Sequence, residues 1–122
     1  MNSQNFKKIF LLWGPVVLWC GLIFIMSSMP TLPKVGFIWW DFLMKKSAHI
    51  IEYGILYFLL WRALKGNTKR YLISLILGLL YAISDEYHQS FVMGRTAMAR
   101  DVGFDLLGML IALYWLKKKV KN

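Results

Sequence analysis

The chain alternates long apolar segments with short polar ones, and four of the apolar segments approach the length of a membrane span. They cover about residues 9–26, 46–64, 71–91 and 100–116. A helix needs about 20 residues to cross roughly 30 Å of hydrocarbon, and the second and fourth segments reach that length only with their polar first turns. The pattern predicts an all-α integral membrane protein, a bundle of four transmembrane helices in a single domain of residues 1–122.

The first segment argues most directly against a soluble bundle. Residues 9–26 contain no charged side chain, so they offer no polar face to water. A secretory signal is the alternative, because Lys7 and Lys8 precede the apolar run. The run is long for a signal and no A-x-A-like cleavage site precedes Pro30, so we expect this segment to remain as the first span.

A shorter apolar segment lies between the first and second spans. Residues 35–44 include Trp39 and Trp40, and Pro30 and Pro33 interrupt the chain ahead of them. The segment is too short to cross a bilayer. We predict a short helix or re-entrant element at the outer interface of the membrane, where tryptophan is enriched.

The charged residues predict the orientation of the helices. Lys and Arg are retained on the cytoplasmic side during insertion, and a cytoplasmic N-terminus places ten of the 15 basic residues inside and five outside. The same arrangement puts all six acidic residues in the outer half: Asp41, Glu52, Asp85, Glu86, Asp101 and Asp105. We therefore predict a multi-pass protein with both termini in the cytoplasm. Its net charge of +9 requires no nucleic acid partner, since anionic membrane lipid accounts for a basic inner rim.

Helical periodicity predicts that polar residues of the outer half face one another. Residues three or four apart share a helix face, which groups Lys45, His49 and Glu52 on the second helix. The stripes of the third and fourth helices also contain small residues, which allow close helix approach; they are Gly78, Ala82, Asp85 and Gln89, and Asp101, Asp105, Gly108 and Ala112. We expect these stripes to point into the bundle, with Glu86 facing a different neighbour or the outer loop.

The density of ionisable groups in the outer half requires an explanation. Each costs roughly 2.5–3.5 kcal/mol at the centre of a membrane helix, so pairing or function must offset the cost. One interpretation is a structural lock in which Arg95 and Arg100 pair with carboxylates of the third and fourth helices. The other is a functional site, because two histidines, five carboxylates and a glutamine exceed what helix register requires. The candidate residues are Lys46, His49, Glu52, Asp85, Glu86, His88, Gln89, Arg95, Arg100, Asp101 and Asp105.

Three chemistries fit these residues. A divalent metal could be bound by two pairs of ligands, each spaced three apart: His49 with Glu52, and Asp85 with His88. Phosphate recognition would use Lys46, Arg95 and Arg100, since guanidinium groups grip phosphate oxygens in a bidentate way. General acid–base catalysis would use either histidine with a neighbouring carboxylate.

Two other activities are disfavoured. No serine or cysteine beside a histidine suggests a covalent nucleophile: Ser47, Ser84 and Ser90 lie within helices, where a hydroxyl usually bonds its own backbone. An ion path is disfavoured because residues 55–60 and 109–113, in the inner halves of the helices, are apolar.

At the candidate residues the chain resembles the VanZ-like family. The resemblance rests on K-x-x-H-x-x-E-Y from Lys46, D-E-Y-H-Q-S-F from Asp85, G-R at 94–95, R-D at 100–101 and D-x-x-G from Asp105, and it covers about residues 9–116. The chain departs from the family pattern at Met93, where proline is expected, and at Asp105, where many members carry asparagine. The resemblance implies a small bacterial membrane protein of the cell envelope, associated in the family's namesake with resistance to teicoplanin, a lipid-bearing glycopeptide antibiotic.

Together, the residues and the resemblance predict an outward-facing polar pocket at the tops of the second, third and fourth helices. It would bind or process an amphiphilic or lipid-phosphate envelope molecule, with Arg95 and Arg100 on an anionic head group. Acid, base or metal-ligand roles would fall to His49, His88, Glu52, Asp85 and Glu86. The alternative is a non-catalytic scaffold or resistance factor whose charged cluster is architectural.

Overall fold

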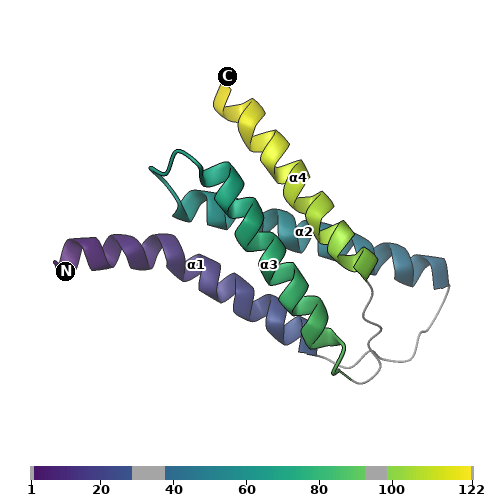
Figure 1. The fold of residues 1–122 in the computed structure, drawn as a ribbon. Helices are drawn as coiled ribbons and strands as arrows, with labels where there is room; N and C mark the ends of the chain where they lie inside the picture. Colours follow the sequence, from purple (N-terminus) through teal and green to yellow (C-terminus); the bar gives the residue numbers. More distant parts are fainter. Residues whose placement is uncertain (1, 29–37, 93–98, 122) are drawn as a thin grey trace.

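Four helices form the chain in the computed structural model, which describes residues 2–28, 38–92 and 99–121, and of residues 38–42 and 121 the backbone alone. They are α1 (Ser3–Ser28), α2 (Ile38–Ala63), α3 (Arg70–Gln89) and α4 (Ala99–Lys121). No strand occurs within these ranges. The prediction of an all-helical chain with four long helices is therefore confirmed (Figure 1).

The start of α2 corrects one prediction. Residues 38–44 are the first turns of α2 and not a separate interfacial element. Neither glycine nor proline occurs between Ile38 and Lys46, so nothing in the backbone interrupts helix propagation there. Residues 35–37, the remainder of the predicted element, lie outside the described residues.

Contacts between the helices show their directions. Tyr81 of α3 donates a hydrogen bond to the Cys20 carbonyl of α1 (2.5 Å), and Ser28 near the end of α1 meets His88 near the end of α3, so these two helices run parallel. Tyr57 of α2 donates to the Tyr71 carbonyl at the start of α3 (2.9 Å), so α2 and α3 run antiparallel. α4 runs parallel to α2, as its side-chain pairs described below show. Successive helices therefore alternate in direction.

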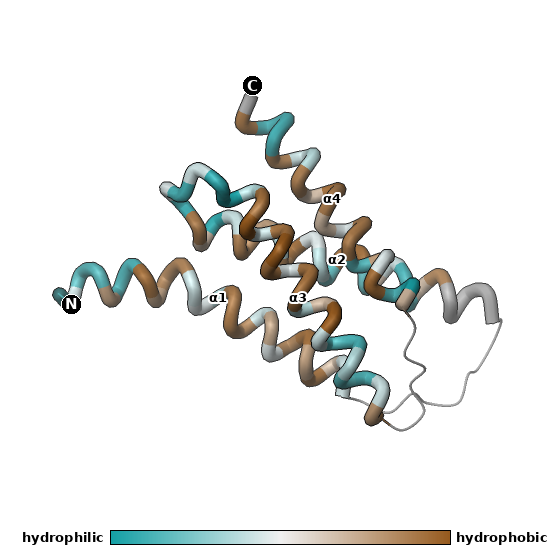
Figure 2. Tube along the Cα trace, viewed as in Figure 1, coloured by the Kyte–Doolittle hydropathy of each residue, from teal (hydrophilic) through white to brown (hydrophobic). Residues whose placement is uncertain are grey.

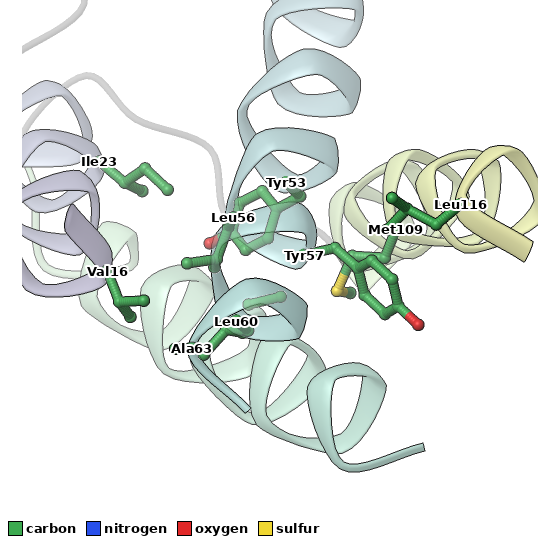
Figure 3. Packing of buried hydrophobic residues seen from close by; sticks show 10 residues of the cluster. Val16, Ile23, Tyr53, Leu56, Tyr57, Leu60, Ala63, Met109 and Leu116 are labelled. Atoms are coloured by element: carbon green, nitrogen blue, oxygen red, sulfur yellow. The ribbon is translucent and has the colours of Figure 1, made fainter. Parts of the chain in front are cut away.

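Helices α2 and α3 form the centre of the bundle. Each contacts all three other helices, whereas α1 and α4 do not touch each other within the described residues. The buried apolar core joins α1, α2 and α4 along α2 (Figure 3). Its largest members are Ile23, Tyr53, Leu56, Tyr57 and Met109, all under 2% exposed.

Glycines set the spacing of α4 against its neighbours. A Cβ atom at Gly108 would collide with the backbone carbonyl of Ile50 on α2, and one at Gly54 would lie 3.3 Å from the Gly108 carbonyl oxygen. A Cβ atom at Gly78 on α3 would collide with the sulfur of Met109. The prediction that Gly78 and Gly108 allow close helix approach is thus confirmed.

The surface of the bundle is largely apolar. Exposed large hydrophobic residues occur on all four helices, and Val17 and Leu18 of α1 are 68% and 77% exposed. Brown apolar stretches fill the middle of α1, α3 and α4 in Figure 2, whereas α2 also carries teal polar residues within its length. By length and composition, α1 is the one helix in the described part of the chain that qualifies as a membrane span.

Candidate functional site: a buried polar cluster

Polar side chains gather at the end of the bundle where α1 and α3 end and α4 begins. We call this set the polar cluster: Ser27, Ser28, Lys46, His49, Glu52, Tyr53, Asp85, Glu86, His88, Gln89, Asp101 and Asp105. Four of its carboxylate residues are buried, with Asp105 only 1% exposed. The inward direction predicted for the stripes of α3 and α4 is therefore confirmed, and Glu86, which we placed elsewhere on α3, is buried as well.

Two charged pairs join α2 to α4. His49 Nδ1 lies 2.7 Å from Asp105 Oδ1, and Lys46 Nζ pairs with Asp101 Oδ1. Both pairs advance along the two helices in the same direction, which makes α2 and α4 parallel. The residue beside His49 on this face is Lys46, whereas Lys45, which periodicity grouped with His49, is exposed. α4 therefore lies nearer to the Lys46 side of α2 than the predicted stripe implied.

Asp85 of α3 connects the remaining helices. Its Oδ1 accepts a hydrogen bond from Ser27 of α1 (2.5 Å), and its Oδ2 accepts one from Tyr53 of α2 (3.1 Å). Both partners are buried. A carboxylate that accepts two hydrogen bonds from different helices fixes the relative positions of α1, α2 and α3.

The pairs form one continuous electrostatic unit. Asp105 interacts electrostatically with Asp85 and Asp101 as well as with His49. Glu52 and Asp101 in turn act on His49. The second carboxylate oxygen of Asp105, Oδ2, is buried and accepts no hydrogen bond from a described residue. Such a group costs roughly 1–3 kcal/mol, so the cluster contains an acceptor that the described protein atoms leave unsatisfied.

The second histidine occupies a separate corner at the ends of α1 and α3. His88 Nε2 lies 2.8 Å from Ser28 Oγ, and its ring stacks on Phe24 with centroids 4.5 Å apart. Ser28 is therefore a serine beside a histidine that the sequence analysis did not consider. Nothing in the sequence indicates this pair, because Ser28 and His88 lie on different helices. Ser84 and Ser90 bond their own backbone, as expected.

The Ser28 hydroxyl also lies 2.7 Å from the Phe24 carbonyl, which can only accept. When the hydroxyl donates to that carbonyl, His88 Nε2 must donate to Ser28 Oγ. A histidine in that state cannot remove the serine proton, as a catalytic dyad requires. The Ser28–His88 contact therefore acts as a tie between helix ends.

The predicted metal ligands do not converge. His49 faces Asp105 on α4, whereas His88 faces α1. The two histidines therefore do not bring Glu52 and Asp85 together around one site. Within residues 2–28, 38–92 and 99–121, no three His, Cys, Asp or Glu side chains come close enough to hold a metal ion.

The predicted anion-binding residues are only partly described. Arg95 lies outside the described residues, as does Met93. Arg100 is exposed on the first turn of α4, next to buried Asp101. Gln89 is buried on α3. Among the basic candidates, Lys46 and His49 have defined pairing partners, which are Asp101 and Asp105.

Comparison with protein families identifies the chain. The model of the VanZ/LLP1 family matches residues 10–118, nearly the whole length of the sequence. The chain belongs to the VanZ/LLP1 family. The match includes every residue of the polar cluster in this VanZ/LLP1 member, and it confirms the resemblance that the motifs indicated. Neither a curated protein nor a solved structure matches the chain.

Proposed function

We propose that this VanZ/LLP1 member is a multi-pass protein of the bacterial cell membrane whose polar cluster binds or processes the polar head of an amphiphilic envelope molecule. All four helices would span the membrane, with both termini in the cytoplasm and the cluster near the outer face. A lipid phosphate is the head group that the basic candidates favour.

The distribution of side chains supports the membrane placement. Asp85, Asp101 and Asp105 are buried while Leu18, Ile83 and many other large apolar residues are exposed. Water would penalise this arrangement, and contiguous apolar surface of this extent is typical of proteins that contact lipid. The alternating helix directions and the two-to-one excess of basic residues at the opposite end favour cytoplasmic termini.

The observation that carries the site is the state of Asp105. Its Oδ1 holds the His49 imidazole at 2.7 Å, and its Oδ2 is buried without a hydrogen bond from any described residue. An imidazole held by a carboxylate can take up or release a proton on a bound molecule. A polar group of a bound molecule that donates a hydrogen bond to this oxygen would satisfy it.

The head group would meet the basic residues at the rim of the same end. We place Arg95 and Arg100 on its anionic oxygens, with Lys46 beside them, since arginine grips phosphate in a bidentate way. His49, Glu52 and the acids of α3 would then lie beneath the head group. Association with resistance to a lipid-bearing glycopeptide, which the family resemblance implies, fits a protein that acts on such a molecule.

A non-catalytic scaffold is the second candidate. It is favoured by one observation: the Lys46–Asp101 and His49–Asp105 pairs both join α2 to α4, as a structural lock would. Under this reading the cluster stabilises the bundle, and any effect on antibiotic susceptibility arises through the protein's surface or a partner.

His49→Gln tests the proposal, because glutamine can keep a hydrogen bond to Asp105 but cannot take up or release a proton. Ser84→Ala is the matched control, since Ser84 is exposed on α3 and bonds only the Tyr81 carbonyl. Three quantities are compared: melting temperature in detergent, teicoplanin susceptibility of a bacterial host expressing the chain, and co-purifying lipids identified by mass spectrometry. A folded His49→Gln protein that loses the susceptibility effect and the co-purified amphiphile supports the proposal. Unchanged values for both overturn it, and a fall in melting temperature and protein amount that accounts for the phenotype favours the scaffold.

A further inference from the structure

A second feature lies at the opposite end of the bundle from the polar cluster. The C-terminal ends of α2 and α4 enclose an apolar groove of about 490 Å³. Its walls are Phe58 and Trp61 of α2 and Trp115, Leu116, Lys119 and Val120 of α4. The volume is within the range of sites that bind small organic molecules, about 300–1,000 Å³.

The groove follows from the packing of two parallel helices. Gly54 and Gly108 bring α2 and α4 into backbone contact near the cluster. Further along the same pair, the large side chains of Phe58, Trp61 and Trp115 hold the helices apart. In the view of Figure 1, the yellow end of α4 stands away from the ends of α2 and α3. The side chains of Phe58, Trp115 and Val120 remain substantially exposed.

Cations surround the groove. The Lys119 ammonium lies 4.7 Å from the centre of the Trp115 ring, and the Arg70 guanidinium lies 3.7 Å from the centre of the Trp61 ring. Each of the two tryptophan rings that line the groove therefore has a positive charge over it. The sequence has no Asp or Glu between residues 52 and 85 or after residue 105, so no acidic side chain of these segments offsets the charge.

We propose that this groove binds one anionic phospholipid of the cytoplasmic leaflet, with an acyl chain against Phe58 and Leu116 and the phosphate at Lys119. Charge complementarity selects an anionic lipid over a neutral one, and basic pockets between membrane helices on the cytoplasmic side bind such head groups. The proposal uses the membrane orientation given above but concerns a surface that the polar cluster does not share.

Tryptophan quenching tests the occupant directly. The full chain is placed in nanodiscs containing equal fractions of phosphatidylglycerol and phosphatidylcholine, and only one of the two lipids carries brominated acyl chains. The contribution of Trp115 is the difference between the wild-type protein and Trp115→Phe. We expect brominated phosphatidylglycerol to quench Trp115 more strongly than brominated phosphatidylcholine, by roughly fivefold in effective occupancy, because one cation near the surface is worth about 1 kcal/mol.

Charge variants assign the preference to the groove. Lys119→Gln should abolish it and Lys119→Arg should retain it. Lys118→Gln removes a neighbouring charge that does not line the groove, and it should leave the preference in place. His49→Gln should also leave it in place, which separates this proposal from the function of the polar cluster.

Three results would overturn the proposal. Equal quenching by the two lipids, or a preference that persists in Lys119→Gln, would mean that Lys119 selects no anionic lipid. A Trp115 that neither lipid quenches would mean that protein covers the groove, and chemical cross-linking would then show whether a second copy of the chain is the occupant.

Discussion

Gly108→Ala is the substitution for which the structure predicts the clearest consequence. An added Cβ atom would collide with the carbonyl oxygen of Ile50 and lie 2.9 Å from its carbonyl carbon. Both atoms belong to the backbone of α2, so no side-chain rotation can remove the overlap. Helices α2 and α4 must separate, and the His49–Asp105 pair one turn away must lengthen with them.

The magnitude follows from two opposing terms. Overpacking of a well-packed contact costs roughly 1–3 kcal/mol, and strain on a buried charged pair adds to this. Replacing glycine by alanine within a helix stabilises the helix by about 1 kcal/mol. Gly103→Ala on the same helix measures this helix-propensity gain alone, because nothing lies within 4 Å of a Cβ atom built at Gly103. The helix-propensity gain is common to both variants, so we expect Gly108→Ala to be less stable than Gly103→Ala by the overpacking cost, roughly 1–3 kcal/mol.

Thermal unfolding of both variants in the same detergent measures this difference. For a chain of this size, the expected gap corresponds to roughly 5–15 °C in melting temperature. Gly103→Ala should melt at or slightly above the wild-type temperature. Equal melting temperatures for the two variants would refute the backbone contact between α2 and α4 on which the geometry of the polar cluster depends.

Three further experiments probe other contacts. Tyr53→Phe removes one of the two hydrogen bonds to buried Asp85 and should lower the unfolding free energy by about 1–3 kcal/mol; an unchanged stability would mean that this bond is not formed. In a double-mutant cycle, Lys46→Gln should cost roughly 3–5 kcal/mol because it leaves buried Asp101 without its Lys46 partner, Asp101→Asn should cost less because Lys46 is only partly buried, and the double variant should cost less than their sum; additive effects would show that the two are not coupled. Gly78→Ala meets only a flexible methionine sulfur, so its stability should remain within about 1 kcal/mol of wild type, and a loss as large as that of Gly108→Ala would contradict this packing.

Sequence periodicity predicted the inner faces of α3 and α4 because their small and polar residues recur at three- and four-residue intervals. Gly78, Ala82 and Asp85 are buried as the spacing required. On α2 the same rule selected Lys45, where the structure pairs Lys46. Adjacent lysines differ by about 100° around a helix, and only the position of α4 decides which of them is buried.

The partners of the polar residues could not be predicted, because they lie on other helices. Ser27 and Ser28 at the end of α1 carry no sequence signal of a role, yet they contact Asp85 and His88 about 60 residues away. The four candidate metal ligands do not converge within the described residues for the same reason: spacing along one helix shows which residues share a face, but not which neighbour they meet.

The parallel course of α2 and α4 explains why two different surfaces arise from one helix pair. The two helices touch where Gly108 meets Ile50, and this contact brings short-range pairs such as His49–Asp105 within reach on one side of it. Beyond it, the bulk of Trp61 and Trp115 prevents the same closeness and leaves an apolar groove. Because both effects depend on the same backbone contact, a substitution that separates the helices at Gly108 should disturb the polar cluster and the groove together, whereas Lys119→Gln should affect the groove alone.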